Sequence, residues 1–415
     1  MRTISINKIL ANVFLFFALF PYVSFGLNDM NMQPWHIVFG SISLLFFMSS
    51  KVANKTYYLF AFPLLVIVIG ILTTETYDFL LFRAIASYFS FFLVLSLFKI
   101  YIDRYGMPIK FFVVVNIIYL LSSLVQLNIG FNFLSFLIIP NGFASVTRGV
   151  HSLTPEPTYF AIVLFFLNWI YLVSSNYQLP VKIKILFFIN IVFVIFIAKS
   201  AMVTIFLITA MLVYLFSILK KKNTIYLFFL LMSIFFIMVA IFLNFNPNSR
   251  IFNLVSLFQG QQMGVFDSIV TLINLDKSIN DRVWNLVFPY YGLFFNYLLP
   301  GGFYSFAEIS VTLGEYSNGY FWAGFGSNKI LSFVGAFIYE LGFLGVIFFI
   351  VIYTYLRDLH NSKRKFEIIL LFIILNSAIP VSFPLVPILI ALMLHHKSGH
   401  TSNNTHRNSR YRSKP

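Results

Sequence analysis

The 415-residue chain contains no cysteine, and only 10% of its side chains are charged. The absence of cysteine excludes disulfide bonds and thiolate metal ligands. The scarcity of charge excludes an ordinary soluble domain, whose surface needs charged groups to face water. Hydrophobic residues make up 60% of the chain instead, and aromatic residues 20%. Apolar runs long enough to cross a bilayer recur along most of the sequence, which predicts a membrane protein with many spans.

The fold class predicted from these runs is all-α: an integral membrane protein with about twelve transmembrane helices. The spans are expected at about 9–27, 35–50, 57–73, 79–99, 110–128, 157–175, 181–198, 200–219, 224–244, 331–356, 366–379 and 382–395. The first could instead be a signal peptide, because Ser24-Phe25-Gly26 places small residues at cleavage spacing. Residues 366–395 contain Pro380, Pro384 and Pro387, and could form two short spans or one broken re-entrant pair.

Basic residues alternate between the predicted loops, and this pattern predicts the topology. Of the 28 Lys and Arg residues, 21 fall on one side of the membrane, which is expected to be the cytoplasmic side. Both termini then face the cytoplasm. A net charge of +15 can indicate a nucleic-acid partner, but here the loop pattern explains it and no nucleic acid is predicted. The tail, 396–415, is predicted to be a disordered basic segment near anionic lipid rather than a metal site.

Residues 1–395 are therefore expected to form a single transmembrane domain with two long outer loops, at about 129–156 and 245–330. The second loop lies between spans nine and ten. Its aromatic stretch VWNLVFPYYGLFFNYLLP (283–300) contains Pro289 and Gly292, and is predicted to be a helix lying in the membrane interface.

Four arginines stand on or near the outer side: Arg83 inside the outer end of a span, and Arg148, Arg250 and Arg282 in the outer loops. Guanidinium groups bind phosphate oxygens bidentately and keep their charge at any working pH. A polyprenyl diphosphate carries its charge at this depth, and cations would stabilise it as a leaving group. The outer loops offer no paired-aspartate motif for magnesium, so neither a metal nor another cofactor is predicted.

Two of these arginines have simpler interpretations that stay open. Arg83 could extend to the outer headgroups or pair with Asp78 or Glu75, and Arg250 could serve only on the surface.

Three further residues are candidates for chemistry. His151 and Glu156 lie in RGVHSLTPEPTYF (148–160), at the entrance to a span, where either could act as a base toward an acceptor hydroxyl. His151 could equally be a plain loop residue, and Glu156 beside Pro157 could cap a helix. Glu340 lies inside a predicted span and must be paired, protonated or facing water, while the nearby glycines also fit helix packing.

Three stretches together resemble one family. RGVHSLTPEPTYFAIVLFF (148–166) is similar to the segment of bacterial O-antigen polymerases in which Glu-Pro-Ser/Thr precedes a span. SINDRVWNLVFPYYGLFFNYLLPGGFYSF (278–306) resembles the late outer loop of the O-antigen polymerase and ligase superfamily. KILSFVGAFIYELGFLGVIFFIVIY (329–353) is similar to the span that follows that loop.

The resemblance implies a metal-independent glycosyltransferase of the bacterial inner membrane with a periplasmic active site. Its substrates would be undecaprenyl-diphosphate-linked oligosaccharides, and a chain-length regulator protein is an expected partner. The family often has Ser-Arg where this chain has Lys199-Ser200, so Lys199 is a secondary candidate for the cation, as Glu340 is for the site.

The ligase branch is expected to use a histidine in the large outer loop. Residues 245–330 contain none, which favours a polymerase. An O-antigen ligase, a lipid-linked oligosaccharide flippase or other transporter, and a non-catalytic scaffold remain the alternatives.

Overall fold

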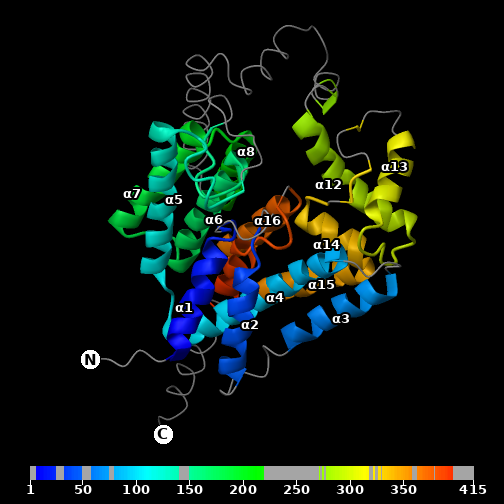
Figure 1. Ribbon diagram of the computed structural model, residues 1–415, viewed down its shortest axis with the longest axis horizontal. Helices are drawn as coiled ribbons and strands as arrows, with labels where there is room; N and C mark the ends of the chain where they lie inside the picture. Colours follow the sequence, from blue (N-terminus) through cyan, green and yellow to red (C-terminus); the bar gives the residue numbers. More distant parts are fainter. Residues whose placement is uncertain are drawn as a thin grey trace. The chain divides into compact units, whose positions relative to one another are not determined.

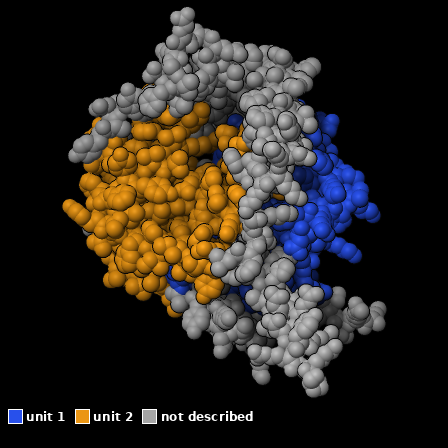
Figure 2. Space-filling view, turned by 180° about the vertical axis from the view of Figure 1, so that it is seen from behind, with its two compact units in different colours: residues 1–63, 88–204, 382–415 blue, residues 64–87, 205–381 orange. Residues whose placement is uncertain are grey.

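The structure, a computed structural model, divides the chain into two compact units, coloured separately in Figure 2. Unit 1 comprises Met1–Pro63, Tyr88–Thr204 and Ser382–Pro415, and unit 2 comprises Leu64–Ser87 and Ile205–Val381. The residues described are 6–24, 32–48, 58–73, 79–139, 149–218, 271, 273–274, 277–316, 321–322, 326–328, 330–357, 362–377 and 379–395. The predicted span 224–244, Arg148, Arg250 and the tail 396–415 lie outside them.

The described residues form helices and no strand, as the composition predicts. Three helices are long and apolar enough to cross a membrane: Leu81–Tyr105, Ile109–Ile129 and Pro157–Ser174. Six shorter apolar helices of 10 to 17 residues accompany them within the same ranges. The chain is therefore a helical, membrane-embedded protein.

Unit 1 is built around α6. Its helices are α1 (Ile6–Leu19), α2 (Trp35–Met48), α5 (Ile109–Ile129), α6 (Pro157–Ser174), α7 (Val181–Val192) and the π-helix η2 (Phe193–Ile197), shown in Figure 1. Three more helices, α3 (Tyr58–Thr73), α4 (Phe79–Tyr105) and α8 (Ala201–Ile218), contribute residues to both units.

The apolar window of α6 is 78% buried, whereas that of α5 is 39% buried. A helix that is apolar all round belongs in the interior of a bundle. Polar side chains join this central helix to its neighbours: the Asn190 amide donates to Asn168 Oδ1 at 2.7 Å, and Asn116 donates to the Tyr171 hydroxyl at 3.4 Å.

Unit 2 contains α12 (Lys277–Phe295), α13 (Phe306–Tyr316), α14 (Phe333–Leu341), α15 (Phe343–Leu356) and α16 (Ser362–Leu375). α12 packs against α13 and α14 around an aromatic cluster of Trp284, Phe288, Phe306 and Tyr339. Trp284 and Phe288 stack with ring centroids 3.9 Å apart. The helix predicted within 283–300 is confirmed, although it begins earlier and continues through Pro289 to Phe295.

The predicted span 331–356 is wrong as a single helix, because the chain breaks at Gly342 into α14 and α15. Gly342 has φ 60° and ψ −138°, a conformation that side chains rarely adopt, and a Cβ there would lie 2.5 Å from Leu299 C. The preceding loop fills the break: Gly301 N donates to Tyr339 O and Phe343 N donates to Leu298 O, both at 2.9 Å. The Pro-Gly-Gly turn and the Glu-Leu-Gly motif thus form one packed junction.

The C-terminal region also contains two separate helices. α16 ends at Leu375, and a further apolar helix covers Leu385–His395. Pro380 and Pro384 stand in the non-helical stretch between them, whereas Pro387 lies in the first turn of the second helix.

Candidate functional site

The sequence motif at 149–156 forms a buried loop in unit 1, held by Gln126 of α5. Ser152 N donates to Gln126 Oε1 at 2.7 Å, and Gln126 Nε2 donates to Ser152 O at 3.1 Å. The Thr154 hydroxyl donates to His151 O and to Glu156 O, at 2.7 and 2.8 Å. Because the Gln126, Ser152 and Thr154 side chains are buried, these bonds are shielded from water and fix the loop.

His151 is 1% exposed, and both of its ring nitrogens contact protein atoms. Nε2 lies 3.0 Å from Phe131 O, and Nδ1 lies 3.0 Å from Ser152 O and 3.3 Å from Gln126 Nε2. A neutral imidazole has one N–H, so it can donate to only one of the two carbonyls. Burial lowers the pKa of His151, an effect that the surrounding backbone carbonyls oppose in part. The ring is placed to hold the loop, and its role as a base stays a prediction.

Glu156 occupies the N-cap position of α6, directly before Pro157 at the first helical position. Its backbone is extended, with φ −144° and ψ 151°, and its side chain makes no capping hydrogen bond. Glu156 as a whole is only partly buried. Glu156 thus holds the capping position that its sequence context allowed, without a capping bond to the helix amides.

Lys199 lies beside the start of the same loop. Val150 N donates to Ile197 O at 3.0 Å, and Gly149 (φ 88°) approaches the Ile197 and Ala198 carbonyls so closely that a Cβ would lie 2.5 Å from Ile197 O. Lys199 itself has φ 48°, where the chain turns from η2 into α8. The fold therefore brings together two sequence segments, 149–156 and 197–200, that were singled out separately.

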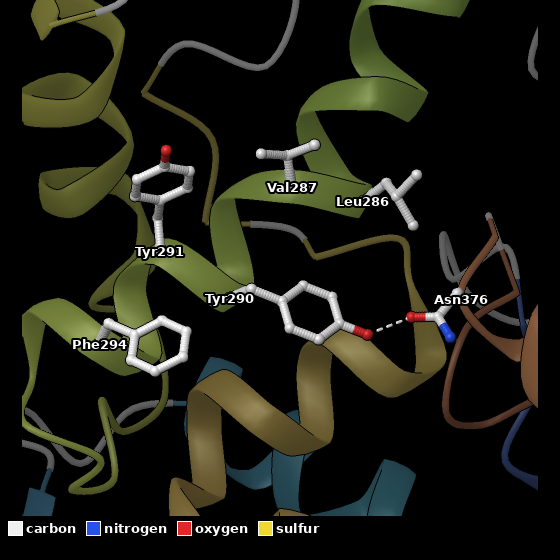
Figure 3. Close-up of a pocket in the computed structure, with 6 residues that line it drawn as sticks. All are labelled: Leu286, Val287, Tyr290, Tyr291, Phe294 and Asn376. Carbon is white, nitrogen blue, oxygen red and sulfur yellow. Dashed lines mark hydrogen bonds between the residues drawn. The ribbon is translucent and has the colours of Figure 1, made fainter.

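Unit 2 contains an open groove of about 670 Å³ along one face of α12, shown in Figure 3. Its lining is mostly apolar and aromatic: Leu286, Val287, Tyr290, Tyr291, Phe294 and Asn376. Arg282 is partly buried and lies one turn before Leu286 on this helix. At 100° per residue, Arg282, Leu286 and Tyr290 share one side of α12, with Arg282 about 6 Å along the axis from Leu286.

Tyr290 and Asn376 provide the polar contact in the groove. The Tyr290 hydroxyl donates to Asn376 Oδ1, and the Asn376 amide donates to Phe372 O at 2.8 Å, so Tyr290 joins α12 to the end of α16 (Figure 3). Burial raises the pKa of Tyr290, which keeps the phenol protonated and able to donate.

Two buried asparagines tie α12 to neighbouring backbone segments. Asn280 donates to Ile273 O at 3.1 Å and accepts from Trp322 N at 3.0 Å. Asn285 Oδ1 accepts from Leu331 N at 2.7 Å. The Asn280 and Asn285 side chains thus bind backbone segments outside the helix and fix α12 within unit 2.

The remaining predicted residues of unit 2 are Arg83 and Glu340. Arg83 is exposed near the start of α4, and Glu340 is partly buried in α14, where its carbonyl accepts from Gly302 N at 3.3 Å. Throughout the part of the chain that is described, no group of three or more His, Asp or Glu side chains could hold a metal ion.

Gln126, Tyr290 and Asn376 were missed as site residues in the sequence. Gln126 could have been noticed as a polar residue at the end of a predicted span, two positions before its boundary. Tyr290 and Asn376 gave no usable signal, because they are far apart in the chain and meet only through packing.

No protein-family model, curated protein or solved structure matches this chain.

Proposed function

We propose that the protein is a polysaccharide polymerase of the O-antigen type, a glycosyltransferase that joins undecaprenyl-diphosphate-linked oligosaccharide units. The proposal includes twelve spans, cytoplasmic termini and an active site on the periplasmic face of a bacterial inner membrane. One observation carries it: an apolar, aromatic groove runs along α12, and Arg282 stands on that helix one turn before Leu286, which lines the groove.

This arrangement suits an amphipathic lipid with an anionic head. Leu286, Val287 and Phe294 offer apolar contact to a prenyl chain, while Arg282 offers a permanent bidentate cation to the diphosphate. The groove volume falls in the range of about 300–1,000 Å³ that small-molecule sites occupy. A groove of this size fits the part of the lipid next to the diphosphate, with the rest of the chain remaining in the bilayer.

The proposed reaction is an inverting transfer. A hydroxyl of the acceptor sugar attacks the anomeric carbon of the donor, a C–O bond forms, and the bond to the lipid diphosphate breaks. The leaving diphosphate gains negative charge, which Arg282 would stabilise in the transition state, with Arg83, Arg148 and Arg250 as further candidate cations. Glu156 would take the hydroxyl proton or orient the acceptor, with His151 as the other candidate base.

The test is an Arg282→Ala substitution in a cell that lacks the native chain, read on a gel of surface glycan. We expect long glycan to disappear while single repeat units stay attached to their acceptor. Lys277→Ala is the matched control, because Lys277 is an exposed cation on the same helix. A wild-type distribution of chain lengths in Arg282→Ala would refute the proposal, whereas a loss of all attached repeats would indicate a ligase.

A second variant tests the groove without removing the arginine. Leu286→Glu places a carboxylate one turn from Arg282, where residues four apart on a helix can pair. The pair would neutralise the cation and put charge into the groove, so we expect the same loss of long glycan as in Arg282→Ala. Full polymer length in Leu286→Glu would show that the groove does not take part.

A further inference from the structure

Tyr22 follows the end of α1 in unit 1, and its hydroxyl is a buried polar group without a hydrogen bond. The side chain is 2% exposed, and no atom of the described residues pairs with the hydroxyl. Burying an unpaired hydroxyl costs free energy, so such a group requires an explanation. The residues packed around Tyr22 suggest a reason for this unpaired hydroxyl.

The Tyr22 ring packs against the first turn of α6. Its centroid lies 5.5 Å from that of Tyr159, with the rings tilted by 43°. Tyr159 N in turn donates to Glu156 O at 3.1 Å, which places Tyr159 in the turn that Glu156 begins. Glu156 holds the N-cap position of that turn.

The position of Tyr22 is fixed by its neighbours rather than by its own hydroxyl. The Tyr119 hydroxyl donates to Leu19 O at 2.9 Å, and Ser24 N donates to Leu137 O at 2.7 Å, so the backbone is held on both sides of Tyr22. The Tyr22 ring is thus held against the turn that Glu156 begins, and its hydroxyl contributes no hydrogen bond to the described residues.

We propose that Tyr22 and Glu156 form a subsite that binds a hydroxyl group of the acceptor carbohydrate. The inference rests on the proposed function and adds the acceptor side to it. Glu156, which is partly exposed, accepts a hydrogen bond from the sugar. The Tyr22 phenol supplies a second bond that the protein itself leaves unmade. Tyr159 offers an aromatic ring beside them for the C–H face of the sugar.

The experiment compares binding of two probes by the detergent-purified chain. One probe is undecaprenyl diphosphate, and the other is the oligosaccharide released by mild acid from lipid-linked repeats that accumulate in a cell lacking this chain. Tyr22→Phe should weaken oligosaccharide binding about tenfold, the value of one hydrogen bond to a ligand, and leave diphosphate binding unchanged. Arg282→Ala should weaken diphosphate binding and leave oligosaccharide binding unchanged.

Tyr101→Phe is the matched control. It removes the hydroxyl of another buried tyrosine, which donates to Asn12 Oδ1 at 2.9 Å, so it should lower thermal stability without changing oligosaccharide affinity. Tyr22→Phe should leave thermal stability unchanged or raise it, because no protein bond is lost.

A Tyr22→Phe variant that binds the oligosaccharide within twofold of the wild type would overturn the subsite, as would a wild-type chain with no measurable affinity for this probe. Neither result bears on the proposed binding of the diphosphate at Arg282. The proposed function fails separately, if the wild type does not bind undecaprenyl diphosphate more tightly than Arg282→Ala.

Discussion

Replacing Gln126 with methionine should release the loop that carries His151 and Glu156. Methionine keeps the approximate length of the side chain but can neither accept from Ser152 N at 2.7 Å nor donate to Ser152 O at 3.1 Å. Two buried backbone groups then lose their partners, at about 1.4 kcal/mol each, or about 2.8 kcal/mol together. Since 1.4 kcal/mol is a factor of ten, the Ser152 amide should exchange with solvent about 100-fold faster.

Hydrogen–deuterium exchange of the purified chain, followed in peptides covering 150–156, measures this effect. Asn128→Met is the control, because Asn128 is on the same helix and donates only to Leu124 O at an exposed position. Gln126→Glu gives a finer test: the ionised carboxylate keeps the acceptor for Ser152 N and loses the donor. Protection should be partly recovered at low pH, where the protonated acid can donate. Unchanged exchange in Gln126→Met would mean that Gln126 does not hold the loop.

Three further predictions concern the two units. Because burial lowers the pKa of His151 below its ordinary value of 6.5, the protonated ring is disfavoured in the folded loop. Loop protection should therefore decrease as the pH falls below about 6.5, and His151→Gln should abolish that dependence. Gly342→Ala should destabilise the chain by more than about 2 kcal/mol through backbone strain and a clash, whereas Gly106→Ala, at φ 75° with nothing within 4 Å, should show the smaller strain alone. Thermal unfolding of the wild type, Gly342→Ala and Gly106→Ala measures the loss of stability in each variant. A double-mutant cycle on Asn168 and Asn190 should give a coupling of about 0.6 kcal/mol, and a value near zero would contradict their hydrogen bond.

The apolar pattern predicted the helices well, because long runs without charge have few alternatives to a helix in lipid. The helices α5 and α6 begin and end near the predicted positions, α4 begins as predicted but continues past 99 to Tyr105, and Pro157 marks the start of α6 as expected for a first-turn proline. Hydropathy could not detect the break at Gly342, because both sides of it are equally apolar. The break depends on a loop forty residues earlier, whose amides meet the carbonyls of α14 only after folding.

The candidate site was less predictable. His151 and Glu156 stood out in the sequence because charge is rare there, yet the structure gives the buried His151 several protein contacts and leaves Glu156 partly exposed. The residues that create the groove and the Tyr22 subsite are ordinary aromatic side chains in an aromatic-rich chain. Their importance depends on their neighbours in the fold and on the hydrogen bonds that they do not make there. The sequence pattern shows neither of these.

The junction at Gly342 sets an order of events during biogenesis. Residues 298–302 leave the ribosome before the helix end they must meet, so the Gly301 and Gly302 amides lack their partners until Tyr339 and Glu340 have been synthesised and inserted. The segment ending at Gly302 can therefore reach its final form only after the following hydrophobic stretch has been inserted. A nascent chain arrested before residue 333 would present this segment unanchored to the quality-control proteases.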